Sequence, residues 1–222
     1  MNTLKSLQEY GNSVNVNEDK LDIIKSDWAN WLIYGRLMCG PFPGLDGINI
    51  KTIEDAKENL YNIINDGIDV FVCLQDEIKF GKGHPYFLEY EDYSKTIRDV
   101  CREKNITKKI LFLYFPIEDQ RCPAHNVFVS HISAIAELFM KGHNIYIHCA
   151  GGHGRTGVYV SCFLATLYKN KRIDIDYFMG YVQFRHDKRR IKDRKCKQYF
   201  VSSPNTKEQR SFVKDFSKFL KF

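Results

Sequence analysis

Long hydrophobic runs are missing from this 222-residue sequence. No apolar segment approaches the roughly 18 residues that a membrane-spanning helix needs. The first ten residues also lack the charged and then apolar pattern of a secretory leader. We therefore expect a soluble, intracellular protein of the cytoplasm, without a membrane span. Internal repeats are absent as well, which argues against a repeat architecture.

The seven cysteines lack the spacing of a disulfide framework or of a zinc site. They are scattered along the chain, without short paired intervals and without the density of a secreted disulfide scaffold. Most of them should be reduced thiols, which agrees with a cytoplasmic location and would let a catalytic thiol survive. We expect neither a metal nor a cofactor.

Acidic residues are in the minority, with 27 Asp and Glu against 33 Lys and Arg and a formal net charge of +6. This balance favours anionic partners, which include phosphoproteins, nucleic acid and acidic lipid, without choosing among them. The most basic segment, residues 185–197, is expected to be a solvated helix face or loop. The alternative is a substrate-binding rim for phosphopeptide, inositol lipid or RNA.

The composition is that of a globular protein, with 44% hydrophobic and 14% aromatic residues. That supply is ample for one buried core, so we expect a single catalytic domain over residues 26–222. Residues 1–25 are expected to be a polar arm, whose first twenty residues form a loose segment or a short helix on the surface.

Apolar runs alternate with segments of helical spacing along the rest of the chain. Buried strands are predicted at 68–74, 110–115 and 144–149. A short strand that ends in a loop rich in glycine and proline is predicted at 31–44. Helices are predicted at 50–66, about 86–104, 125–141 and 158–168, with further helices within 173–222. This order predicts an α/β fold with a central, mostly parallel sheet flanked by helices, and a ligand beyond the carboxyl ends of the strands.

A glycine-rich segment, IHCAGGHGRTG, includes the end of the last predicted strand. It places Cys149 directly after the strand and Arg155 at the start of the next helix. Gly151, Gly152 and Gly154 let the backbone turn its N–H groups inward, and a helix N-terminus adds a partial positive charge. The segment therefore predicts a cradle for a phosphate group.

Two side chains of this segment carry the predicted chemistry. Arg155 offers a planar fork that can hold two phosphate oxygens at once. Cys149, surrounded by N–H groups, a helix dipole and an arginine, should be a thiolate at neutral pH. The residues expected to bind the substrate phosphate are Ala150, Gly151, Gly152, His153, Gly154 and Arg155.

Other sites with similar patterns fit the segment less well. The string GHGRTG satisfies G-x-G-x-x-G, but a dinucleotide site has no use for a cysteine and an arginine at fixed spacing. A nucleotide loop of the Walker type needs a lysine where Arg155 stands. A metal site is disfavoured because His148 and Cys149, adjacent after a strand, point apart.

The string HCAGGHGRT resembles the HCxxGxxR[ST] signature loop of the protein tyrosine and dual-specificity phosphatase superfamily at every specified position. LIYGRLMCGPFPG looks like the first strand and turn of small stand-alone bacterial and viral members, and a weaker resemblance extends over residues 31–214. The resemblance implies a dual-specificity phosphatase-like fold and hydrolysis of phosphate monoesters.

A two-step reaction is implied by this resemblance. Cys149 would attack phosphorus while Asp119, from the upstream string YFPIEDQRCP, protonates the leaving oxygen. Water would then hydrolyse the phosphocysteine with Asp119 as the base, and Arg155 and the loop amides would stabilise the charge on the equatorial oxygens. Glu118 is the competing candidate for the acid.

Further residues take supporting roles by the same resemblance. His148 would brace the cysteine and the loop backbone, and the Thr156 hydroxyl would hydrogen-bond the leaving sulfur. SPNTKEQRSFV resembles a late segment whose glutamines position water, with Asn205 at the first such position and Gln209 at the second. Cys73 stands where some members keep a cysteine that protects the nucleophile as a disulfide, but a small buried core residue is the favoured interpretation.

The leading hypothesis is a protein phosphatase that acts on phosphotyrosine, with phosphoserine and phosphothreonine as further substrates. A phosphoinositide phosphatase and an RNA 5′-triphosphatase are alternatives with the same chemistry. Similar lipid enzymes carry lysines in the cradle, where this sequence has Ala150 and His153, and the RNA enzymes can work without the aspartate. A catalytically silent phospho-binding module is the alternative from another class, and it usually lacks the cysteine, arginine or aspartate.

Overall fold

The computed structural model describes residues 2–14, 29–47, 49–78, 92–189 and 201–219. In this part of the chain the strands are β1 (Asn30–Ile33), β2 (Leu37–Gly40), β3 (Val70–Gln75), β4 (Leu111–Ile117) and β5 (Ile145–His148). The helices are α1 (Asn2–Tyr10), α2 (Ile53–Asn65), α3 (Tyr93–Glu103), α4 (His125–Met140), α5 (Gly154–Leu167), α6 (Ile175–Asp187) and α7 (Lys207–Phe219), with a short 3₁₀ helix η2 (Lys169–Lys171).

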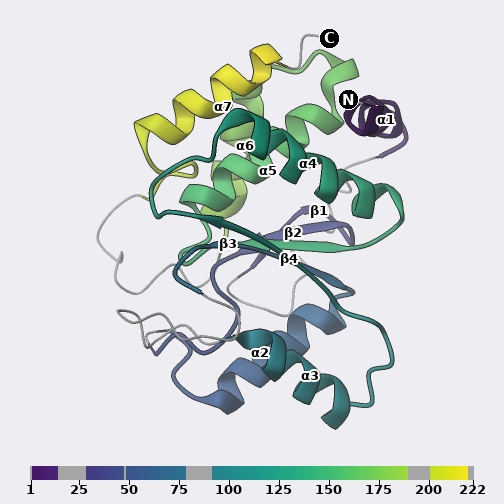
Figure 1. Cartoon of the computed structure of the whole chain (residues 1–222), viewed down its shortest axis with the longest axis vertical. Helices are drawn as coiled ribbons and strands as arrows, with labels where there is room; N and C mark the ends of the chain where they lie inside the picture. Colours follow the sequence, from purple (N-terminus) through teal and green to yellow (C-terminus); the bar gives the residue numbers. More distant parts are fainter. Residues whose placement is uncertain (1, 15–28, 48, 79–91, 190–200, 220–222) are drawn as a thin grey trace.

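The strands form one sheet in the order β1-β2-β5-β3-β4, in which only β1 is antiparallel to its neighbour. Helices α2 and α3 cover one face of the sheet, and α1 and α4 to α7 cover the other (Figure 1). This arrangement confirms the predicted α/β fold with a mostly parallel sheet and helices on both faces. None of the described helices is long and apolar enough to cross a membrane.

The middle of the sheet carries the most complete burial. Every residue of β3 and β5 is buried, as their continuous apolar runs predicted. The prediction of burial on both faces is wrong for β4, whose residues are mostly half-buried. The reason is its place at the edge of the sheet, where it has a neighbouring strand on one side only.

The segment 31–44 forms two strands where the sequence predicted one. β1 and β2 pair as an antiparallel hairpin, and the chain reverses at Gly35, whose φ of +68° favours glycine. β2 then runs beside β5 in parallel register, with Gly40 opposite His148. The hairpin thereby brings its last residues to the carboxyl end of β5.

Helix α5 is the central buried helix that was predicted at 158–168. It begins earlier, at Gly154, and every residue from Arg155 to Leu167 is buried. Helix α3 begins at Tyr93 because the Asp92 side chain caps it by accepting a hydrogen bond from the Ser94 backbone N–H. The rest of the predicted helix 86–104, residues 86–91, lies outside the described residues.

The N-terminal segment contributes to the core. Residues 2–10 form α1, whose Leu4 and Leu7 are buried in the same hydrophobic cluster as residues of α4 and α5. The short helix anticipated there is therefore observed, and its apolar side is packed against the domain.

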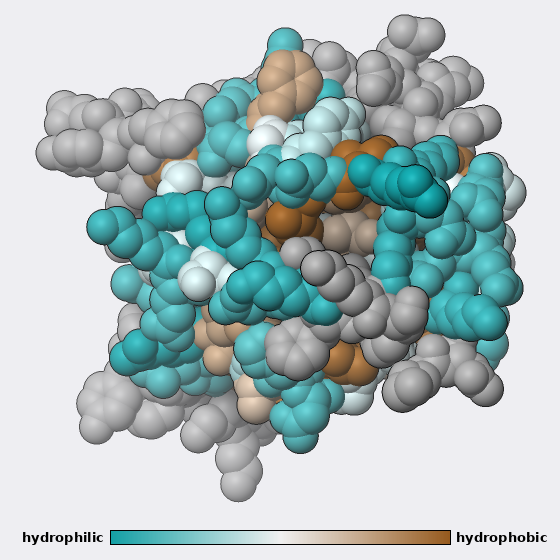
Figure 2. All heavy atoms as spheres, turned by 90° about the horizontal axis from the view of Figure 1, so that it is seen from above, coloured by the Kyte–Doolittle hydropathy of each residue, from teal (hydrophilic) through white to brown (hydrophobic). Residues whose placement is uncertain are grey.

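Figure 2 shows hydrophilic residues around a hydrophobic area near the centre of the face seen from above.

Candidate active site

The loop between β5 and α5, Cys149–His153, is called the cysteine loop below. It lies at the carboxyl end of β5, which has parallel partners β2 and β3 on its two sides. Gly152 has a φ of +69°, and a Cβ on it would lie 2.2 Å from the carbonyl carbon of Gly40. Only glycine fits at this position without movement of the backbone.

A pocket of about 210 Å³ opens beside the cysteine loop. It is lined by Asp119, Gln120, Cys149, Gly151, His153, Gly154, Arg155, Asn205 and Gln209. All of these except Gln120 are site residues predicted from the sequence. Segments far apart in the chain thus converge on one cavity at the N-terminus of α5.

Arg155 is held firmly beside this pocket by contacts along its guanidinium group. Its two terminal nitrogens donate to the two carboxylate oxygens of Glu77, each at 2.8 Å, and one of them also donates to the backbone carbonyl of Ile117 at 2.8 Å. The other nitrogen lies 3.0 Å from Asp119 Oδ1. The remaining donor, Nε, is buried and has no hydrogen-bond partner in the described part of the chain.

Glu77 is a site residue that the sequence analysis missed. Burial alone would raise its pKa, but hydrogen bonds and the charge of Arg155 outweigh burial and hold the pKa below its ordinary value. Its neighbour Asp76 has a raised pKa because of burial and the adjacent Glu77 charge. The available signal was position, since both acids follow β3 at the edge of the sheet where the cysteine loop follows β5.

Asp119 reaches the pocket from the segment after β4. Its side chain is 63% exposed, and the next residue, Gln120, has a φ of +64°. Glu118, the competing candidate for the acid, is exposed and does not line the pocket. The geometry favours Asp119 over Glu118 as the group that faces a bound ester.

His148 is buried beneath the loop. Its Nε2 lies 2.7 Å from the hydroxyl of Tyr93, and its ring is surrounded by the rings of Phe42, Tyr93 and Tyr146. Burial lowers the pKa of His148 to about 3, so the imidazole is neutral near pH 7. A buried histidine that is outside the pocket lining and has so low a pKa is a weak base, so it fits a positioning role better than that of a general base.

Thr156 is fully buried in the first turn of α5. Its hydroxyl has no hydrogen-bond partner among the residues that the structure describes, the Cys149 sulfur included. Its predicted contact with the leaving sulfur therefore stays a prediction.

Arg189 contacts the cysteine loop without lining the pocket. Its guanidinium donates to the carbonyl of Gly152 at 2.9 Å and to Asn30 Oδ1 at 2.6 Å, and it lies 3.7 Å from the sulfur of Cys39. Its fractional exposure is only 6%. A loop carbonyl is thereby fixed by a buried cation that the sequence analysis placed on a solvated surface.

The prediction of a solvated face for 185–197 is wrong for Arg185, His186 and Arg189, which are all buried. Arg185 donates from Nε to the carbonyl of Trp31 at 3.1 Å. The physical reason is that the two arginines satisfy polar groups of the β1–β2 hairpin and of the cysteine loop that would otherwise be buried without these donors. Burial lowers the pKa of His186 to about 3, so this side chain is neutral near pH 7. Residues 190–197 lie outside the described residues.

The segment before α7 closes another side of the loop. The Ser203 hydroxyl donates to the carbonyl of His153 at 2.9 Å. Gln209 is buried, and its Oε1 accepts from the backbone N–H groups of Asn205 at 3.2 Å and Thr206 at 3.1 Å. Asn205 and Gln209 both line the pocket, and their water-positioning role stays a prediction.

Cys73 is a free, buried thiol on β3, in register with His148 on β5. Burial raises the pKa of its thiol to about 12, which keeps it protonated and unreactive near pH 7. Its proposed disulfide with the nucleophile stays a prediction.

Comparison with protein families gives one match that covers most of the chain. The model for the "Swiss Army Knife protein, DSP-PTPase phosphatase domain" matches residues 28–199. Two viral proteins match over shorter segments. A candidate tyrosine phosphatase, 067L of Invertebrate iridescent virus 3, is 34% identical over 58 residues, which cover 24% of this chain and 24% of that protein. Its counterpart 197R of Invertebrate iridescent virus 6 is 35% identical over 66 residues, which cover 28% of this chain and 25% of that protein.

Solved structures of phosphatases resemble the whole fold. Kinase associated phosphatase, with its catalytic-site cysteine replaced by serine, has a TM-score of 0.59 at 16% identity and covers 83% of this chain and 86% of its own. PTPMT1 in complex with PI(5)P has a TM-score of 0.55 at 12% identity, with coverages of 87% and 96%. Tk-PTP in its active form has a TM-score of 0.54 at 17% identity, with coverages of 82% and 92%. At these identities the similarity is one of fold.

Proposed function

The chain belongs to the family of dual-specificity and tyrosine phosphatase domains, and from that premise we propose that it hydrolyses phosphate monoesters on proteins through a phosphocysteine intermediate. Phosphotyrosine is the proposed main substrate, with phosphoserine and phosphothreonine also accepted. The observation that carries the proposal is the pocket that Cys149, Arg155 and Asp119 line together.

The first step would transfer the phosphoryl group to the protein. The thiolate of Cys149 attacks phosphorus, so that an S–P bond forms while the P–O bond of the ester breaks. Asp119 donates its proton to the leaving oxygen. In the absence of substrate Asp119 is paired with Arg155 at 3.0 Å, and an arriving phosphate would replace it there and release it toward the leaving group.

Arg155 would bind the phosphoryl group through its unused donor. Glu77 fixes the plane of the guanidinium by two hydrogen bonds, which leaves the buried Nε without a partner among the described residues. A phosphate oxygen at this position would satisfy it. Because the arginine is already oriented, little reorganisation is needed as charge develops on the equatorial oxygens.

The second step would return the loop to its thiolate form. A water molecule attacks phosphorus, the S–P bond breaks, and Asp119, now a carboxylate, accepts the proton of the water. Asn205 and Gln209 line the same pocket and could hold that water. The products are inorganic phosphate and the free enzyme.

The size of the pocket supports a permissive protein phosphatase. Its volume of about 210 Å³ lies below the roughly 300 Å³ at which pockets for drug-sized ligands begin. A phosphoryl group with its ester oxygen takes up most of that space, so the pocket holds little of the attached side chain. Selection between tyrosine and the shorter serine and threonine would therefore be weak.

A phosphoinositide phosphatase is the second candidate, and the polar lining of the pocket favours it. Gln120, His153 and Asn205 line the pocket and offer hydrogen-bonding groups to the phosphate oxygens or to an inositol hydroxyl next to the phosphate. The lysines that similar lipid enzymes carry in the cradle are replaced by Ala150 and His153.

The function is tested by hydrolysis of p-nitrophenyl phosphate, a phosphotyrosine peptide, a phosphothreonine peptide and a short-chain phosphatidylinositol phosphate, without metal and with reductant. Cys149→Ser should abolish turnover, and Asp119→Ala should lower kcat by about 10²-fold or more. Glu118→Ala is the matched control and should stay within about twofold of wild type. Rapid quenching of the wild type during hydrolysis of p-nitrophenyl phosphate should trap a phosphoenzyme that Cys149→Ser does not form.

The relative rates on the substrates decide between the two candidates. Turnover of the lipid alone would replace the protein phosphatase by the second candidate. Inactivity of the wild type on every substrate would overturn both.

A further inference from the structure

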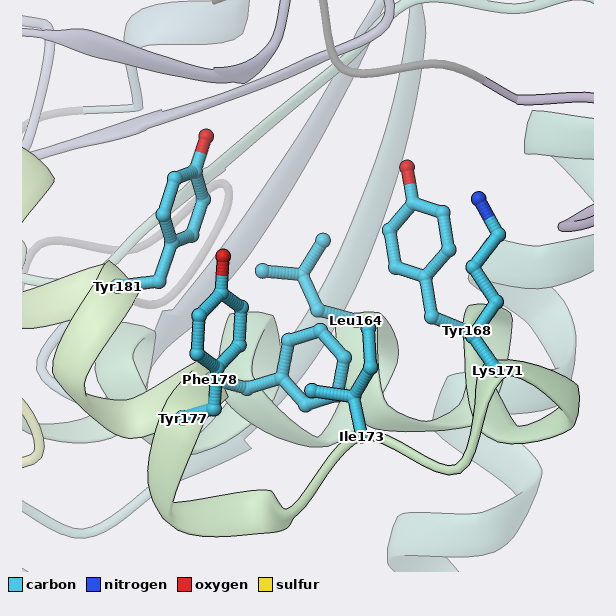
Figure 3. A pocket seen from close by; sticks show the side chains of 7 residues that line it. All are labelled: Leu164, Tyr168, Lys171, Ile173, Tyr177, Phe178 and Tyr181. Carbon is cyan, nitrogen blue, oxygen red and sulfur yellow. The ribbon is translucent and has the colours of Figure 1, made fainter.

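A second cavity lies between α5 and α6, at the end of α5 opposite to the cysteine loop. Its volume is about 190 Å³, and it is lined by Leu164, Tyr168, Lys171, Ile173, Tyr177, Phe178 and Tyr181 (Figure 3). Helix α5 has 14 residues and therefore spans about 20 Å at 1.5 Å per residue. The two cavities share no lining residue and stand at opposite ends of that helix.

The walls of this cavity are apolar and partly open to solvent. Leu164 and Phe178 are buried, whereas Tyr177 is 57% exposed and Ile173 is 37% exposed. Figure 3 shows Tyr177, Phe178 and Tyr181 on one side of the cavity and Tyr168 on the other. An accessible hollow lined by aromatic rings is the kind of surface that binds apolar groups.

The volume of the cavity selects a small occupant. An apolar cavity of about 150 Å³ can bind benzene, so 190 Å³ has room for one six-membered ring. Pockets for drug-sized ligands start at about 300 Å³. A single aromatic side chain fits, and the surrounding rings can contact it in the edge-to-face geometry that aromatic pairs prefer.

Among the described residues, Lys171 is the one charged residue in the lining of the cavity, and two further basic residues stand close to it in the chain; these three residues are called the basic rim below. Lys169, Lys171 and Arg172 lie in η2 and just after it, and Lys171 Nζ stands 4.9 Å from the centre of the Tyr168 ring. The acidic residues of the same stretch have other partners. The Asp174 side chain caps α6 by accepting from the Asp176 N–H at 3.0 Å, and Asp176 is paired with Lys214 at 3.1 Å.

We propose that this cavity is a docking site for an acidic segment of a partner protein that inserts one aromatic side chain. The ring would occupy the space between Tyr177, Phe178 and Leu164, and the flanking carboxylates would face the basic rim. A buried aromatic anchor surrounded by complementary charge is a common basis of affinity and specificity in protein interfaces.

The docking site would also supply a contact with the protein substrate that the active-site pocket lacks. This role rests on the proposed protein phosphatase function. That pocket holds little beyond the phosphoryl group, so a second contact is needed to select a protein substrate. The separation of about 20 Å requires at least six extended residues between the anchor and the phosphorylated residue. The partner bound at the cavity is then the substrate itself.

Binding is tested first with a fluorescein-labelled peptide, Asp-Glu-Asp-Phe-Glu-Asp-Glu, which carries no phosphate. Fluorescence anisotropy should show that replacing its Phe by Ala weakens binding about tenfold or more. Tyr177→Ala and Lys171→Glu should each weaken binding of the Phe peptide by about tenfold.

Phe184→Ala and Lys188→Glu are matched controls on and just after α6. Phe184 is 55% exposed, Lys188 stands 5.3 Å from the centre of its ring, and neither lines the cavity. Both variants should bind the Phe peptide within about twofold of wild type. All four variants should hydrolyse p-nitrophenyl phosphate as wild type does, which shows that the active site is intact.

Several results would overturn the proposal. Equal binding of the Phe and Ala peptides, or equal losses in the controls, would reduce the effect to general charge attraction. Absence of peptide binding together with self-association that Tyr177→Ala abolishes would assign the cavity to a second copy of the chain. Absence of peptide binding together with sedimentation on phosphatidylserine vesicles would assign it to a lipid surface.

The link to substrate selection is tested with phosphotyrosine peptides that carry the anchor ten residues from the phosphate. The anchor should lower KM about tenfold at unchanged kcat in wild type, and should have no effect in Tyr177→Ala. If the anchor leaves KM unchanged, the substrate role is wrong. If no phosphopeptide is hydrolysed but the anisotropy results hold, docking stands and the proposed function fails.

Discussion

Replacing Arg189 by methionine should displace the cysteine loop, although Arg189 itself does not line the active-site pocket. The guanidinium is 6% exposed and donates to the carbonyl of Gly152 at 2.9 Å and to Asn30 Oδ1 at 2.6 Å. Methionine fills a similar volume but cannot donate. The carbonyl of Gly152 and the amide oxygen of Asn30 would then be left without this donor inside the protein.

The size of the effect follows from these contacts. Each hydrogen bond to a charged group contributes about 1.5–3 kcal/mol, and an acceptor left buried without a partner costs about 1–3 kcal/mol. Removal of the desolvated cation offsets part of that loss. We expect a net decrease of about 2–4 kcal/mol in the free energy of unfolding. A loop displaced by about 1 Å should also lose roughly 10²-fold in kcat/KM.

The assay combines urea unfolding, followed by tryptophan fluorescence, with p-nitrophenyl phosphate kinetics. Arg185→Met is the matched control, because Arg185 is an equally buried arginine that donates to the Trp31 carbonyl on β1 and not to the loop. It should lose stability but keep its kcat/KM under conditions where it is folded. Arg189→Lys should be intermediate, since a point charge can replace only part of the fork.

Two outcomes would refute this reasoning. An unchanged kcat/KM in Arg189→Met would show that the loop holds its shape without the arginine. An equal fall in kcat/KM for Arg185→Met would show that general destabilisation, and not loop position, accounts for the effect.

Three further predictions concern the loop and its supports. Gly152→Ala would place a methyl group 2.2 Å from the carbonyl carbon of Gly40. The value of kcat/KM in steady-state assays should therefore fall by about 10²-fold or more. Wild-type kinetics in this variant would contradict the close approach. Glu77→Gln keeps the shape of the side chain but removes the charge that orients Arg155, so the inhibition constant of inorganic phosphate should rise by about tenfold. A lower inhibition constant would mean that Glu77 blocks the arginine. Between its unfolded pKa of 6.5 and its folded pKa of about 3, His148 takes up a proton only in the unfolded state, so the free energy of unfolding should fall as pH drops through this window. The urea midpoint at several pH values checks this. A pH dependence that His148→Asn leaves unchanged would contradict it.

The features that could be predicted from the sequence depend on residues close together in the chain. The cysteine loop places a nucleophile, glycines and an arginine within seven positions of one another, so their chemistry could be inferred without knowledge of the fold. Strands β3 and β5 were predictable because burial on both faces leaves a continuous apolar run. Asp119 was predicted through family resemblance; it lines the pocket, and its role as the acid stays a prediction.

The supports of the loop were not predictable, because they arise from contacts between distant segments. Glu77 and Arg189 are charged residues, which are usually solvated. The position of Glu77 after β3 indicates the correct edge of the sheet but not its pairing with Arg155, and nothing local indicates that Arg189 is buried against the cysteine loop. The hairpin turn at Gly35 did leave a local signal, a glycine between two apolar pairs, which the prediction of one strand passed over.

The arrangement of the loop has a consequence for the protein during its synthesis. Gly40 and Gly152, which approach each other closely in the fold, are both synthesised before the last parts of the pocket. Ser203 and Gln209 leave the ribosome later than the loop that they close. At about 5–20 residues per second, the 60 residues from position 149 to position 209 take roughly 3–12 s to appear. During that interval Cys149 of the nascent chain would lie in a pocket that still lacks Asn205 and Gln209. Under the proposed function, a chain interrupted before residue 203 would therefore lack a complete pocket and would be inactive, and hydrolysis would begin only after residue 209 has left the ribosome.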